Sequence, residues 1–224
     1  MQGVRLIGYL LMALASGVPA ARAADVALIL GDTGQTATLR NDTSITSVDF
    51  AAPLRQAGFE IIQPRNRSSG NMRLAAQRVE AALAAGTVNR LVIVVMGPVA
   101  SSARESWALS NGAAGASSLN IGVTGIPLGA LSDMAAAAKG QAVILIAPGR
   151  AVDTLGLGLE PGLTDLKAAP GVTYVTGPAD LLTETLTDGL LTAGRSFDDI
   201  ARDAPQGVSV TGFVSGEVGL MGQE

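Results

Sequence analysis

The strongest indication of the fold comes from LVIVVMGPVA at residues 91–100 and AVILIAPGR at residues 142–150. Each begins with a continuous apolar run rich in Val, Ile and Leu, and each run ends at a Gly or a Pro. Continuous apolar runs of this length are typical of parallel strands that helices cover on both faces. We therefore expect both stretches to form central strands of a parallel sheet.

Further runs of strand length lie on either side of these two. They are VALIL at residues 26–30, FEIIQ at 59–63 and VTYVT at 172–176. Between residues 97 and 126 the chain is instead dominated by Gly, Ser, Ala and Asn, with Trp107 as its one large side chain. This composition predicts a long irregular segment anchored by Trp107.

Segments with helical periodicity separate the apolar runs. The clearest helix covers residues 72–83, and Gly86 supplies a C-terminal stop. The helix expected between the first two strands must place Pro53 in its first turn, because an interior proline breaks a helix. The other expected helices are 128–138 with Pro127 in the first turn, 182–190, and a short helix opened by a capping box of Ser196 and Asp199. Alternation of strands and helices predicts an α/β fold.

The first residues have the order of a secretory signal peptide. Arg5 precedes an apolar run over residues 6–18, and a small-x-small triplet follows at residues 21–23. We expect residues 1–23 to be a signal peptide and residues 24–224 to form a single domain, periplasmic or secreted. A signal anchor is the alternative interpretation.

Composition excludes several kinds of partner. Without residues 1–23, 13 Lys and Arg face 19 Asp and Glu, a net charge of −6. An acidic domain lacks the basic surface that nucleic acids and anionic lipids need. We therefore expect no nucleic acid partner, and no membrane partner after signal cleavage. The chain also contains no Cys, so no disulfide stabilises it.

The chain contains no Cys and no His, which excludes whole chemistries. Cys–His and Ser–His–Asp catalysis require these residues, and zinc sites normally use them. No G-x-S-x-G elbow or calcium loop is present, and Lys139 fits a helix end better than a Ser–Lys dyad. We expect no catalytic residue of these classes, no metal site and no cofactor.

Weak binding candidates remain at the strand ends. Asp32 and Arg150 each follow an apolar run, and ligands of open α/β sheets bind beyond the carboxyl ends of strands. Asp32 can equally cap a turn. The paired acids Asp198 and Asp199 fall in the first turn of an expected helix, where acids stabilise the helix dipole without any catalytic role.

The order of these parts resembles the caspase-like cysteine peptidase family, that of caspases and metacaspases. VALILG at 26–31 and Gly58-Phe59 resemble its first strand and its second-strand turn, while VIVVMGPV at 92–99 and VILIAPGR at 143–150 resemble its two catalytic strand ends. GVTYVTGPADLL at 171–182 and SFDDIARDA at 196–204 resemble the small-subunit half.

The resemblance implies a three-layer sandwich, in which a mostly parallel central sheet carries helices on both faces. It also implies that Pro98 stands where the family has its catalytic His, and Pro148 where it has the nucleophilic Cys. An unrelated doubly wound α/β domain is the alternative fold.

Two function classes follow from these residues. The first is a non-catalytic pseudo-peptidase that binds a peptide or protein partner or acts in regulation. The second is an enzyme of another class, which would use carboxylate and Arg groups at the carboxyl edge of the sheet.

Overall fold

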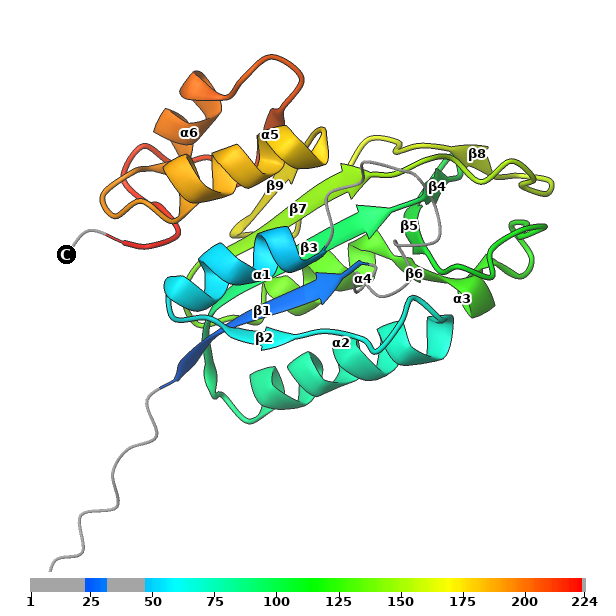
Figure 1. Cartoon of the computed structure of the whole chain (residues 1–224), viewed down its shortest axis with the longest axis horizontal. Helices are drawn as coiled ribbons and strands as arrows, with labels where there is room; N and C mark the ends of the chain where they lie inside the picture. Colours follow the sequence, from blue (N-terminus) through cyan, green and yellow to red (C-terminus); the bar gives the residue numbers. More distant parts are fainter. Residues whose placement is uncertain (1–22, 32–46, 223–224) are drawn as a thin grey trace, which may run out of the picture.

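The computed structural model describes residues 23–31 and 47–222. At its centre is a six-stranded sheet in the order β10-β9-β7-β3-β1-β2, parallel except for β10 (Figure 1). Its strands are β1 Ala24–Leu30, β2 Glu60–Ile62, β3 Val88–Gly97, β7 Ala142–Pro148, β9 Val172–Thr176 and β10 Ser209–Gly212. Each of the five apolar runs overlaps one of these strands, so the predicted parallel sheet is confirmed.

Helices cover both faces of this sheet (Figure 1). One face packs against α2 and α4, and the other packs against α1, α5 and α6. The bounds are α1 Ser47–Gln56, α2 Ser69–Ala84, α4 Leu128–Ala135, α5 Ala179–Glu184 and α6 Phe197–Asp203. A mostly parallel sheet between two helical layers is the predicted three-layer α/β sandwich.

The core lies on both faces of β3 and β7. Residues 91–95 and 142–147 are at most 4% exposed. Because successive side chains of a strand point to opposite faces, Ile93 and Ile144 pack toward α2 and α4, whereas Val94 and Leu145 pack toward α1 and α5. Burial of each of these side chains contributes about 1.5–3 kcal/mol to the free energy of folding. In the described part of the chain, this core forms without a disulfide.

Three helix predictions need correction. Pro53 lies in the second turn of α1, not the first, and burial of Phe50 and Leu54 offsets its missing hydrogen bond. Pro127 is the N-cap of α4 rather than part of its first turn. That helix ends at Ala135, since the next residues tighten into three-residue turns such as Ala138 N–H to Ala135 O at 3.1 Å.

The helix predicted at 182–190 changes character along its length. It begins in α5, and from Thr185 to Leu190 it widens into a π-helix, η2, in which Leu186 and Leu190 stay buried. The capping box of Ser196 and Asp199 is present at the start of α6, as predicted.

Residues 97–126 are not an irregular segment, and that prediction was wrong. They contain most of a second, antiparallel sheet in the order β6-β5-β4-β8, together with the short helix α3. The bounds are β4 Val99–Ser101, β5 Ser106–Leu109, α3 Ile121–Thr124, β6 Gly125–Pro127 and β8 Glu160–Pro161. Small residues such as Ala100 and Ala113 form its core with Leu109, and Trp107 packs against them from β5.

Within the described ranges, no helix combines the length and the apolar character needed to span a membrane.

Candidate functional site at the carboxyl edge of the central sheet

The two central strands end side by side. Gly97 at the end of β3 pairs with Pro148 at the end of β7, and Pro98 comes next along the chain from β3. Both strands point toward the second sheet (Figure 1). Pro148 is exposed, whereas Pro98 is half-buried because β4 begins immediately after it. This is the edge at which open α/β sheets place their ligand sites.

The backbones of the two strand ends are in direct contact. Gly149 N–H donates to Gly97 O at 2.8 Å, which extends the strand pairing by one residue. A Cβ on Gly149 would lie 2.7 Å from the Cα of Gly97, closer than real Cβ atoms approach other atoms. The strand ends therefore leave no room for a side chain between Gly97 and Gly149.

Arg67 fills the space above the end of β3. It belongs to the segment between β2 and α2 and is only 4% exposed. Its guanidinium donates to Leu109 O and lies against Gly97, whose φ of +118° requires glycine. A Cβ on Gly97 would overlap that guanidinium. Asn111 N–H donates to Arg67 O at 2.9 Å, which ties this segment to the second sheet.

Of the two weak binding candidates only Arg150 lies among the described residues, so a shared site stays a prediction. Asp32 lies outside the described residues. Arg150 is exposed two residues beyond the end of β7, and no ion pair joins it to another described residue. Residues 23–31 and 47–222 also contain no group of three acidic side chains placed to hold a metal ion.

The two prolines at this edge offer no catalytic side chain. A proline side chain can neither attack a carbonyl nor exchange a proton. A guanidinium has N–H donors and no acceptor, so Arg67 and Arg150 supply hydrogen-bond donors and positive charge. Arg67 and Arg150 can donate hydrogen bonds and attract anions, and none of these four residues carries a nucleophilic side chain.

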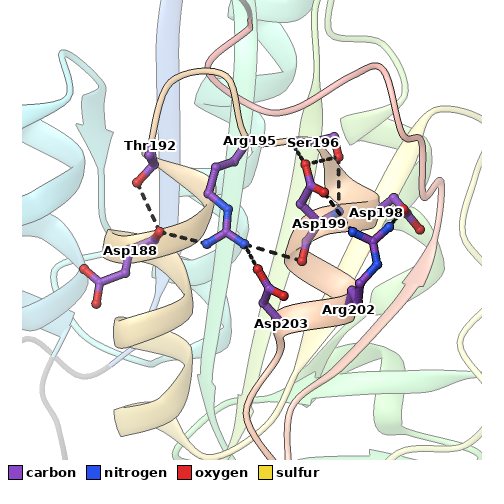
Figure 2. A network of polar contacts seen from close by, with 8 residues as sticks. All are labelled: Asp188, Thr192, Arg195, Ser196, Asp198, Asp199, Arg202 and Asp203. Atoms are coloured by element: carbon purple, nitrogen blue, oxygen red, sulfur yellow. Dashed lines mark hydrogen bonds and ion pairs between the residues drawn. The ribbon is translucent and has the colours of Figure 1, made fainter.

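The paired acids near α6 have structural partners (Figure 2). Asp199 N–H donates to Ser196 Oγ at 3.1 Å, and Ser196 N–H donates to Asp199 Oδ2 at 3.2 Å. Hydrogen bonds from Ser196, followed by those from Arg202, hold the pKa of Asp199 below its usual value. Arg202 also pairs with Asp198. A general acid needs a raised pKa, whereas that of Asp199 is lowered. Asp199 is therefore suited to capping α6 and not to general acid catalysis.

A neighbouring arginine joins this network to the preceding π-helix (Figure 2). Arg195 donates to Asp188 O at 3.4 Å and pairs with the carboxylate of Asp203. Thr192 Oγ1 also donates to Asp188 O, at 3.1 Å. These contacts link the end of η2 to α6. The guanidinium of Arg195 is paired with the carboxylate of Asp203.

Comparison with known proteins finds similarity in structure only. No family model matches the chain, and no curated protein matches it. Among solved structures, the Drosophila initiator caspase Dronc aligns with a TM-score of 0.50 and 8% identity, over 91% of this chain and 82% of Dronc. The pro form of caspase-1 from Spodoptera frugiperda gives a TM-score of 0.49 and 12% identity, over 97% of this chain and 99% of that one.

The similarity to Dronc shows that the chain has a caspase-like fold, as the sequence resemblance implied. At 8% identity it shows the fold alone. Because the sequence contains no Cys, the cysteine of caspase-type catalysis is absent.

Sequence reasoning missed two features of this edge, Arg67 and the contact between Gly97 and Gly149. Arg67 stands in a polar segment with no distinctive spacing, so no pattern identified it. The glycines at the two strand ends were a usable signal, since glycine is favoured wherever two backbones approach closely.

Proposed function

We propose that this protein is an exported, non-catalytic caspase-like domain, a pseudo-peptidase that binds a peptide or protein partner or acts in regulation. The observation that carries the proposal is the pair of prolines at neighbouring strand ends. Pro98 directly follows β3 and Pro148 is the last residue of β7, and we equate these positions with the loops that hold the His and Cys of caspase-like peptidases.

The surroundings of the prolines support the proposal. A peptidase must seat its substrate between these loops and hold the developing oxyanion with backbone amides. Here the N–H of Gly149 already donates to Gly97 O, and Pro148 has no backbone N–H to offer. Arg67 covers the end of β3. The fold persists without these catalytic groups because its core depends on aliphatic packing rather than on the strand ends.

A turnover assay tests the absence of catalysis. We expect the purified protein to release no fluorophore from peptides with Arg, Lys or Asp before the scissile bond, at a rate above buffer. Turnover that survives repurification and disappears in Asp32→Asn or Arg150→Ala would overturn the proposal and favour an enzyme of another class.

Mass spectrometry of the protein from its native host tests export. We expect a periplasmic or secreted species that begins at Ala24. An intact Met1 in the membrane fraction would instead identify the first residues as an anchor.

A further inference from the structure

An open groove of about 670 Å³ runs between α2 and α4, on the face of the sheet opposite α1. Its floor is apolar, with Ile126 and Leu131 buried and Leu83 and Met134 partly buried. Its two sides carry four small side chains, those of Ala76, Ala84, Ala130 and Ala137. The groove is separate from the strand ends, since none of Arg67, Gly97 and Gly149 lines it.

The groove has the dimensions of a helix-binding site. On α2 its wall follows a single stripe from Arg73 to Ala84, with the spacing of one helix face. At 1.5 Å per residue this stripe is about 16 Å long, which matches three turns of a bound helix. Small side chains on both walls let a helix backbone approach closely, while larger apolar anchors reach the floor.

The charged side chains on the two sides of the groove, here called the α2 bank and the α4 bank, determine what kind of helix can bind. Glu80 stands on the α2 bank and Asp133 on the α4 bank, both exposed. Within the described ranges, neither carboxylate takes part in an ion pair. The arginine that lines the groove, Arg73, donates to the carbonyl of Gly122 and, at 2.9 Å, to that of Gly125, so its charge is held at the end near α3. The two banks therefore present unpaired negative charge above an apolar floor.

We propose that this groove binds an amphipathic helix of a partner protein, with an apolar face and basic residues on both flanks. The apolar face would cover Leu131 and Met134, and the flanking cations would meet Glu80 and Asp133. The inference rests on the proposed function as a partner-binding domain, and it names the surface and the chemistry of the partner.

Fluorescence anisotropy with a labelled peptide tests the inference. The probe is an 18-residue helical peptide of Leu, Ala and Lys, with lysines on both flanks of a leucine face. We expect saturable one-to-one binding to the purified protein, and at least a tenfold loss of affinity in Glu80→Lys/Asp133→Lys. The control Glu184→Lys/Glu217→Lys changes net charge equally at exposed sites that do not line the groove, and we expect less than a threefold change.

A second variant tests the groove without changing charge. Ala137→Trp fills the space from an exposed position on its wall, and should lower the affinity at least fivefold while the thermal unfolding transition is retained. Equal losses in the groove and control charge variants, or no saturable binding to the native protein, would overturn the inference. Peptide hydrolysis by the protein would overturn the proposed function instead, so the two failures are distinguishable.

Discussion

Neighbouring strands of the central sheet are joined by different contacts at their amino ends and at their carboxyl ends, here called the amino edge and the carboxyl edge. At the amino edge, side chains do this: Arg90 on β3 pairs with Asp25 on β1 at 2.5 Å between Nη2 and Oδ2, and Asn89 donates to the same carboxylate at 3.1 Å. At the carboxyl edge, Gly149 and Gly97 join through their backbones. The edge at which α/β folds usually bind ligands is thus filled by backbone and Arg67, while the opposite edge keeps its polar side chains.

We expect a substitution in the carboxyl-edge contact to lower the free energy of unfolding more than a substitution at the amino edge does. We expect Gly149→Ala to lower the free energy of unfolding by about 3 kcal/mol, because its Cβ would meet the backbone of Gly97, which cannot move aside alone. Urea denaturation measures the loss. The matched control is Gly70→Ala near the start of α2, where a Cβ meets open space. It should be neutral or stabilising by up to about 1 kcal/mol. Equal effects at both glycines would show that the strand ends are not in contact.

The role of Arg67 can be separated from backbone strain by a double-mutant cycle. Gly97→Ala alone should cost about 2 kcal/mol, from its positive φ and from displacement of the guanidinium. In an Arg67→Ala background the same substitution should cost about 1 kcal/mol, since only the backbone strain remains. Additive effects of the two substitutions would contradict the contact between Arg67 and Gly97.

The side-chain link at the amino edge should be weaker. Asp25→Asn removes the ion pair but keeps a hydrogen-bond acceptor for Arg90, and we expect a loss of about 1 kcal/mol in urea denaturation. Asp165→Asn is the control, because Asp165 is exposed, lies outside the helices and strands, and belongs to no ion pair within the described ranges. A loss as large as that of Gly149→Ala would mean that the two edges do not differ as described.

The same link predicts a pH dependence. Burial alone raises the pKa of Asp25, but the hydrogen bond and charge of Arg90, with a hydrogen bond from Asn89, outweigh burial and lower it. A lowered folded-state pKa stabilises the protein above the unfolded value of about 3.9, and this stabilisation is lost as the pH falls through the folded value. The stability difference between the native protein and Asp25→Asn should therefore shrink as the pH falls from about 5 to 3. A constant difference would contradict the pairing.

The central sheet could be predicted from the sequence because its strands are continuous apolar runs. Residues 91–95 and 142–147 are buried on both faces, and no other environment suits them. The second sheet escaped prediction because its strands are only two to four residues long, with small residues such as Ala100 in its core. Pro53 was misplaced because burial of Phe50 and Leu54 overrides the local preference of proline.

The candidate site was predictable only in part. The absence of Cys and His could be read directly, and the ends of β3 and β7 could be located from their apolar runs. The position of Arg67 over Gly97 depends on how the segment before α2 crosses the sheet edge, and no local pattern encodes that crossing.

Restoring the two catalytic side chains tests whether the strand ends can still support peptidase chemistry. Pro98→His/Pro148→Cys returns an imidazole, a thiol and both backbone amides at the strand ends. We expect the double variant to fold, because neither proline belongs to the buried core, yet to cleave Arg, Lys and Asp peptides no faster than Pro98→His alone. The reason is that Gly149 still donates to Gly97 and Arg67 still covers the end of β3. Turnover well above that of the single variant would show instead that only the dyad was lost and that the cleft remains open.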